Sequence, residues 1–339
     1  MTFNNTDASG ARAGRRTSKL LQQPWLPGVL SLIVFVAALV VVYRSLHGVR
    51  LDEVKLQLSQ IGGLSVAAAI VLTLCSYFLI TLYDYLALKH VGFPMTWARM
   101  MPTAFSASAI GHNVGFAALS GGAIRYRGYS MAGLDPARIT GVVVFCVITY
   151  FVGGSLLLGV VLLTEPASVL QNIVVPGLSI GLSIQVLGVV CIVGSLTYVL
   201  WSLVPGSAIK VGALQIKLPR VVIVLWQIAL GATDVFLAAF IMYLLLPSGF
   251  DMPYMAFLGI YLISMAIAAV SNVPGGIGVF EGGILMLVNE IPKPELVASL
   301  VAFRLVYYLL PLIFGLIVFV GQLFHERRTR PAGAPTEDA

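Results

Sequence analysis

Apolar residues occur in long runs separated by short polar segments, and this pattern continues along almost the whole chain. A helix that crosses the hydrocarbon core of a bilayer needs about 20 mainly apolar residues. Runs of that length predict six full transmembrane helices, at 25–43, 64–88, 139–163, 178–201, 221–246 and 296–324. We therefore predict one transmembrane domain over residues 25–324, with a basic tail at 1–24 and a second tail at 325–339.

Two further apolar stretches contain residues that interrupt a helix. The stretch 97–123 includes Pro102 and several glycine and polar residues, and the stretch 254–288 is broken by Pro274-Gly275-Gly276. Proline removes a backbone donor and glycine loosens the helix. At membrane depth, backbone that leaves the helical hydrogen-bonding pattern is stable only inside protein or beside a wet cavity. Both stretches therefore predict broken or re-entrant helical hairpins.

The order of span, hairpin and span occurs twice, in 64–163 and in 221–324, with one connecting span between the two sets. Cytoplasmic loops are enriched in lysine and arginine, which favours a cytoplasmic location for both tails. The first hairpin then enters from the cytoplasm and the second from outside, and the loop with Arg44, Arg50 and Lys55 is an exception. Inverted repeats with interrupted helices point to a transporter site near the midplane. The predicted fold is an all-α polytopic membrane protein with such a repeat.

The composition supports this fold and excludes several classes of function. The chain is 59% apolar and 10% charged, whereas soluble domains are roughly 45–50% apolar and about 25% charged. The net charge of +6 comes from tails and short loops, so we expect no nucleic acid as partner. The sequence contains no phosphate-binding loop and no zinc motif of the H-E-x-x-H type. We expect no cofactor, no metal site and no enzymatic activity.

Three ionisable residues within the apolar runs are candidates for a site, because each costs about 2.5–3.5 kcal/mol to insert at a helix centre. Asp234 lies near the middle of its span, Glu281 lies where the second hairpin restarts its helix, and Arg304 lies about two turns into the last span. One interpretation is an internal ion pair in which Arg304 bridges one or both carboxylates. In the other, the surplus acid is protonated, relays a proton or receives a cationic substrate group.

Further candidates lie in the first hairpin and near its ends. Arg125 and Arg127 follow a glycine pair at its cytoplasmic mouth, where an arginine fork suits a phosphate but where basic residues are also common for topological reasons. Asp84 is close to the end of its span, and an interfacial charge there needs no special role.

Polar residues also mark the two helix breaks. His112 and Asn113 lie at the first break, and Asn272 lies at the corresponding position of the second. Such side chains either bind a polar head group or satisfy backbone groups that the break leaves free.

Three segments resemble a known family: 119–127 (LSGGAIRYR), 273–281 (VPGGIGVFE) and 303–311 (FRLVYYLLP). They are similar to the lysylphosphatidylglycerol synthase transmembrane family, the membrane region of the bacterial multiple-peptide-resistance factor. The resemblance implies a flippase for aminoacylated phosphatidylglycerol in the bacterial inner membrane. In that family a separate soluble domain transfers the amino acid, and we expect that domain to be missing here because the chain ends soon after its last span.

Together these features predict a transporter for a phospholipid, one that has a cationic head group according to the resemblance. Glu281 and Asp234 would receive the cationic group, Arg304 would meet the phosphate, and Arg125 would recruit it at the mouth. The alternatives are a non-transporting partner of a separate lipid-modifying or envelope enzyme and an ion-coupled transporter of small molecules. The sequence also permits a homo-oligomer, since small-residue pairs allow close helix packing within or between chains.

Overall fold

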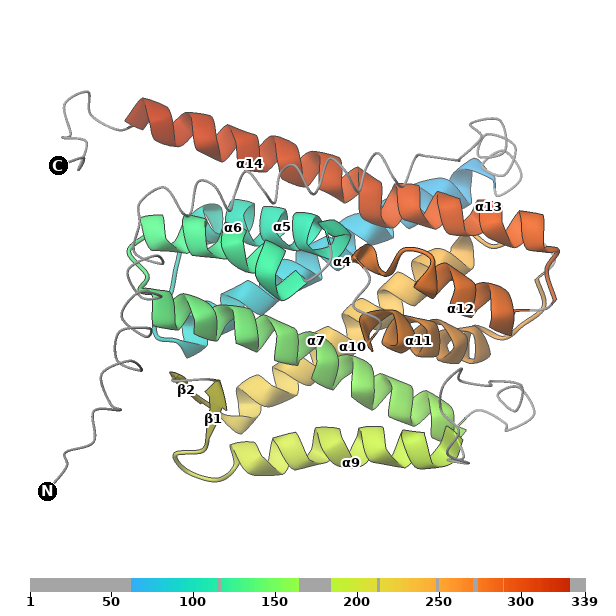
Figure 1. Ribbon diagram of the computed structural model, residues 1–339, viewed down its shortest axis with the longest axis horizontal. Helices are drawn as coiled ribbons and strands as arrows, with labels where there is room; N and C mark the ends of the chain where they lie inside the picture. The colour runs from blue at the N-terminus through green and yellow to red at the C-terminus, as the bar shows by residue number, and fades with distance from the viewer. Residues whose placement is uncertain are drawn as a thin grey trace, which may run out of the picture.

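The computed structural model describes residues 62–114, 117–164, 184–211, 214–247, 250–270, 274–288 and 290–329. The predicted first span and the basic N-terminal tail lie outside these residues. The described helices are α4 (Gly63–His90), α5 (Trp97–Val114), α6 (Ala117–Met131), α7 (Pro136–Thr164), α9 (Ile184–Ser202), α10 (Val221–Leu244), α11 (Tyr254–Val270), η1 (Pro274–Gly276), α12 (Val279–Leu287), α13 (Lys293–Phe303), η2 (Arg304–Leu309) and α14 (Leu310–Thr329), and Figure 1 shows their arrangement.

Five helical segments of the described chain are long and apolar enough to cross a membrane: Gly63–His90, Pro136–Thr164, Ile184–Ser202, Val221–Leu244 and Glu295–Phe324. Each coincides with one of the predicted full spans, and an all-α polytopic membrane protein is confirmed. The sixth predicted span, 25–43, is the one that falls outside the described residues. Between α9 and α10, strands β1 (Ala208–Val211) and β2 (Leu214–Lys217) pair antiparallel, a small hairpin where we expected a loop.

The first predicted hairpin consists of two helices, α5 and α6, that lie side by side (Figure 1). Pro102 lies inside α5 and does not end it. The second helix continues to Met131, beyond the predicted end of the hairpin at residue 123. This extension matters for the site, because Arg125 lies within α6 and not after it.

The second predicted hairpin consists of α11, the short η1 turn and α12. Gly275, Gly276 and Gly278 have φ angles of 62°, 60° and 84°, a left-handed conformation that glycine adopts without steric cost. The Pro-Gly-Gly sequence therefore produces the break at the expected place, and α12 begins at Val279. The leaflet from which each hairpin enters and the inverted relation of the two halves stay predictions.

The breaks of the two hairpins meet in the interior. A Cβ atom on Gly275 would lie 2.9 Å from the main-chain oxygen of Asn113, at the end of α5. The glycine therefore permits a close approach between segments that are about 160 residues apart in sequence.

The last span is a single helical segment that contains a π-helical stretch, Arg304–Leu309, between α13 and α14. A π-helical stretch widens the helix and leaves backbone groups without their usual partners. The amide of Asn113 donates to the carbonyl oxygen of Tyr308 at 3.1 Å and to that of Ala109 at 2.8 Å. The end of α5 thereby supports the irregular part of the last span.

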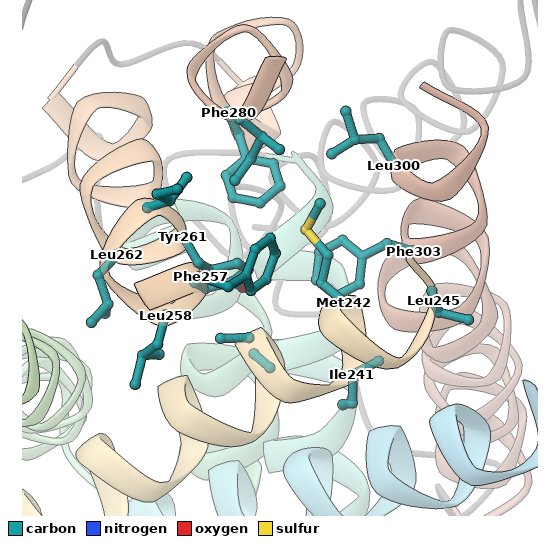
Figure 2. Close-up of a cluster of buried hydrophobic side chains, with 14 of the residues drawn as sticks. Ile241, Met242, Leu245, Phe257, Leu258, Tyr261, Leu262, Phe280, Leu300 and Phe303 are labelled. Carbon is teal, nitrogen blue, oxygen red and sulfur yellow. The ribbon is translucent and has the colours of Figure 1, made fainter. Parts of the chain in front are cut away.

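Aromatic packing joins the elements of the second half, as Figure 2 shows. Phe257 and Tyr261 of α11, Phe280 of α12 and Phe303 of α13 are fully buried around Met242 of α10. The rings of Tyr261 and Phe280 are edge to face with centroids 5.3 Å apart, a favourable arrangement for aromatic pairs. This cluster holds the broken hairpin against the last span.

Candidate functional site

A cavity of about 450 Å³ lies in the interior, between the two halves of the chain. Its walls come from α4, α5, α6 and α7 of the first half and from α10, α11, η1, α12 and η2 of the second. The lining is mainly apolar and aromatic, with Arg125, His112 and Asp234 as its ionisable residues other than tyrosine and cysteine. A largely apolar cavity with a few converging polar groups is typical of a binding site.

The cavity reaches the molecular surface between α6 and α7. Leu119 of α6 and Phe151 of α7 both line it, and they are 72% and 52% exposed. Side chains with such exposure cannot lie in an enclosed void, so the cavity has an apolar opening on this side.

The first polar cluster of the site is a buried ion pair between Asp84 of α4 and Arg125 of α6. Arg125 donates from Nε to Oδ1 at 2.8 Å and from Nη2 to Oδ2 at 2.7 Å. The hydroxyl of Tyr129 also donates to Oδ1 at 2.7 Å, and Arg125 Nη2 donates in addition to Ser108 Oγ at 3.2 Å. Paired contacts of this kind are the strongest that arginine makes with a carboxylate.

This cluster changes two expectations. Asp84 has a specific partner and is not a solvent-exposed charge, because its side chain is fully buried against Arg125. Arg125 does not lie at the mouth of the hairpin: its side chain is 7% exposed and forms part of the cavity wall. The reason is the length of α6, which carries Arg125 inward against α4.

The second cluster surrounds Asp234 of α10, which is 2% exposed. Ser76 Oγ donates to Oδ1 at 2.7 Å, and the hydroxyl of Tyr83 donates to Oδ2 at 3.1 Å. Ser76 Oγ is also 3.1 Å from the hydroxyl of Tyr307. No lysine, arginine or histidine in the described part of the chain contacts this carboxylate.

The third cluster joins Glu281 of α12 to Arg304 at the start of η2, with Nε 2.5 Å from Oε1. Arg304 Nη1 donates to the carbonyl oxygen of Gly275 at 2.9 Å, and the amide of Gly278 donates to Glu281 Oε2 at 2.7 Å. The guanidinium lies over the ring of Tyr308, 4.6 Å from its centroid. Its remaining nitrogen, Nη2, is buried and has no hydrogen-bond partner among the described residues.

The structure thus separates the three charges that the sequence analysis grouped together. Arg304 pairs with Glu281 and not with Asp234, so it bridges one carboxylate and not both. The two clusters are nevertheless neighbours, because Asp234 connects through Ser76 to Tyr307 and Arg304 stacks on Tyr308.

The two polar residues at the first break have different surroundings. His112 lines the cavity and packs against the ring of Tyr77, 6.0 Å between centroids. Asn113 satisfies backbone carbonyls, one of the two roles expected for it. Asn272 lies outside the described residues. Whether any residue of these clusters contacts a ligand stays a prediction.

The hydroxyl residues that bind the acids, above all Ser76, Tyr83 and Tyr129, were not predicted from the sequence. A signal for two of them was available: Ser76 and Tyr83 are seven residues apart and so share one face of α4. The described residues contain no cluster of three or more His, Cys, Asp or Glu side chains placed to hold a metal ion.

Comparisons with known proteins agree with this architecture. The family model of the lysylphosphatidylglycerol synthase transmembrane region matches residues 28–315. The chain is 30% identical to the uncharacterized protein slr0712 of Synechocystis over 310 residues, 90% of this chain and 94% of that protein. It is 25% identical to the inner membrane protein YbhN of Escherichia coli, over 86% of this chain and 91% of that protein.

A more distant relative is much longer. Phosphatidylglycerol lysyltransferase of Staphylococcus aureus is 20% identical over 84% of this chain, and the match covers 32% of that protein. The residues matched by the family model include four of the five described spans and the first part of the last, together with the two hairpins and all three polar clusters. This chain belongs to the lysylphosphatidylglycerol synthase transmembrane region family.

Proposed function

We propose that this protein moves a phospholipid between the two leaflets of a bacterial inner membrane, with the head group passing through the central cavity. The proposal assigns transport to this chain and no synthesis of the lipid. The names of the relatives support only the setting, a membrane and a phospholipid, since one is an inner membrane protein and others are phosphatidylglycerol lysyltransferases.

The observation that carries the proposal is the chemistry of the cavity. Its lining is mainly apolar, it opens between Leu119 and Phe151, and it has Arg125 and Asp234 in its walls. A water-soluble substrate needs no apolar opening on the side of the protein. A lipid does, because its acyl chains remain in hydrocarbon while its head group enters the polar part.

The polar groups suit a head group that contains a phosphate and an ammonium. Arg304 is not among the residues that line the cavity, but it contacts two that are, Gly275 and Tyr308. It has one buried donor, Nη2, without a partner in the described chain, and an unpaired buried donor is costly until an acceptor reaches it. Asp234 is a buried carboxylate with no cationic partner among the same residues. In the proposal, Arg304 binds the phosphate and Asp234 receives the ammonium of an aminoacylated phosphatidylglycerol.

The test is a lipid translocation assay with the purified full chain in liposomes. Fluorescent phosphatidylglycerol or its lysyl derivative is placed in one leaflet, and a membrane-impermeant quencher reports transfer to the other. We expect Glu281→Gln and Arg304→Gln to slow transfer by at least about tenfold. A tenfold change corresponds to an activation free energy about 1.4 kcal/mol higher. Asp135→Asn, in an exposed ion pair with Arg138, is the matched control.

Unchanged transfer in both variants would remove the proposed site. A protein that transfers no lipid but retains a second protein through purification would support the alternative of a partner for a separate enzyme. Uptake of a small molecule that depends on an ion gradient would support the other alternative.

A further inference from the structure

The three acids of the site, of which Asp84 and Asp234 are buried and Glu281 is partly exposed, differ in the kind of group that surrounds them. Asp84 and Glu281 each face a guanidinium, and Glu281 also accepts from a backbone amide. Asp234 is bound only by hydroxyl groups within the described chain, those of Ser76 and Tyr83, and Tyr307 contacts Ser76 in turn.

This difference decides which protonation states each site can hold. A guanidinium or an amide N–H can only donate, so it stabilises an ionised carboxylate and cannot accept the hydrogen of a protonated one. A hydroxyl can donate or accept by rotating its hydrogen. When Asp234 is ionised, Ser76 and Tyr83 donate to it. When it is protonated, its own hydrogen can point to Ser76, which then donates to Tyr307.

The other charged groups near Asp234 leave this conclusion unchanged. In the described chain the ionisable groups that interact with it are tyrosines: Tyr77 and Tyr83 from α4, Tyr150 from α7, Tyr261 from α11, and Tyr307 and Tyr308 from η2. His112 of α5 lines the same cavity but does not contact the carboxylate. From α9, Tyr198 binds Gln227, two turns earlier on α10. Glu295 of α13 is exposed, and the guanidinium of Arg125 is engaged by Asp84.

A buried carboxylate with no cation beside it is costly, and two occupants can neutralise it, a proton or a cationic group. Both reach it through the cavity, because Asp234, Tyr83 and Tyr307 all line the wall. The two occupants compete for the same oxygens.

We propose that Asp234 binds one exchangeable proton that competes with the cationic head group, so that lipid movement is coupled to a proton moving in the opposite direction. This inference rests on the proposed function and names its driving force. The proton binds the carboxylate, whose charge changes from −1 to 0, and the head group leaves. Loss of that proton to the opposite side restores the carboxylate, and no other bond changes.

The first experiment measures the final distribution of lysyl-phosphatidylglycerol across liposomes that contain the full chain and a pH gradient. One-to-one exchange predicts that a gradient of one pH unit accumulates the lipid up to about tenfold in the leaflet that faces the acidic compartment. A sodium gradient of the same size is the control and should leave the distribution even. An even distribution under the pH gradient, with transfer occurring, would overturn the coupling.

The second experiment detects the proton itself and does not depend on transport. Infrared difference spectra of the purified protein, recorded between alkaline and acidic buffer, should show a carboxylic acid band from Asp234. We expect the band to disappear in Asp234→Asn and to remain in Asp135→Asn and Glu281→Gln. Ser76→Ala, which keeps the acid and removes its hydroxyl partner, should shift the pH at which the band appears.

The outcomes separate the two proposals. A band that survives in Asp234→Asn would overturn the assignment of the proton to this residue, whether or not lipid moves. If no lipid moves under any condition, the proposed function fails while the spectra still decide the proton site.

Discussion

The guanidinium of Arg125 and the carboxylate of Asp84 form a paired ion contact, 2.8 and 2.7 Å, that joins α6 to α4 beside the cavity. Both side chains are buried, with 7% and 0% exposure. Replacing only one residue of such a pair is costly, because it leaves the other charge buried without a partner.

Asp84→Asn should therefore destabilise the protein strongly. We expect a loss of about 3–5 kcal/mol in the free energy of unfolding, which is typical of one partner removed from a buried pair. Thermal unfolding of the purified protein in detergent measures the effect.

The exposed pair of Asp135 and Arg138 provides the comparison, with half-exposed side chains and a 3.1 Å contact. Asp135→Asn should change stability by less than about 1 kcal/mol, as usual for surface pairs. Equal effects of Asp84→Asn and Asp135→Asn would contradict the view that burial of the pair is decisive.

The crossing of α7 and α10 depends on two glycines. A Cβ atom on Gly153 would overlap the backbone of Gly231 and Ala232, and one on Gly231 would overlap the carbonyl of Thr149. Gly153→Ala should cost about 1–3 kcal/mol through overpacking, seen as a lower unfolding temperature in detergent.

Gly194, on α9, has open space where the methyl group of an alanine would lie and is the matched control. Gly194→Ala should leave stability unchanged or raise it by up to about 1 kcal/mol, since alanine favours helix. A neutral Gly153→Ala would show that the two helices can separate without loss.

Asn113 should matter through the backbone it supports. Asn113→Ala removes the donor to the Tyr308 carbonyl, and the loss of this hydrogen bond should cost about 0.5–1.5 kcal/mol. Hydrogen exchange of the amides in η2 is the measurement, and we expect faster exchange there.

Thr197→Ala removes an exposed hydroxyl that bonds within its own helix and should leave exchange in η2 unchanged. Equal exchange in Asn113→Ala and in the unmodified protein would show that the π-helical stretch needs no support from α5.

The ring of Tyr308 should contribute to the position of Arg304, whose guanidinium lies 4.6 Å from the ring centroid. Tyr308→Phe keeps the aromatic face and should keep lipid transfer near its original rate. Tyr308→Leu removes the face, worth about 0.5–2 kcal/mol, and should slow transfer several-fold. Equal rates for the two variants would mean that the stacking does not hold Arg304 in place.

Much of the fold follows from local properties of the sequence. The lengths of the apolar runs predict the spans from 64 to 324, because any helix in hydrocarbon must satisfy its backbone internally. The break in the second hairpin follows from Pro274, which lacks a backbone donor, and from the glycines after it, which adopt positive φ angles without steric cost.

The site was only partly predictable. Asp234, Glu281 and Arg304 are visible in the sequence because a charge within an apolar run needs a reason. Their partners cannot be identified in this way. Nothing in the sequence shows that Arg304 forms an ion pair with Glu281, or that Asp84 forms one with Arg125.

The sequence by itself determined that this is a helical membrane protein with two interrupted hairpins and a few charges in its interior. Only the tertiary structure decided how those charges are divided, with guanidiniums for Asp84 and Glu281 and hydroxyls for Asp234. The physical reason is the distance along the chain over which each effect acts. Hydrophobicity and backbone preference act within a few residues, whereas an ion pair depends on which helices pack together and how far each extends.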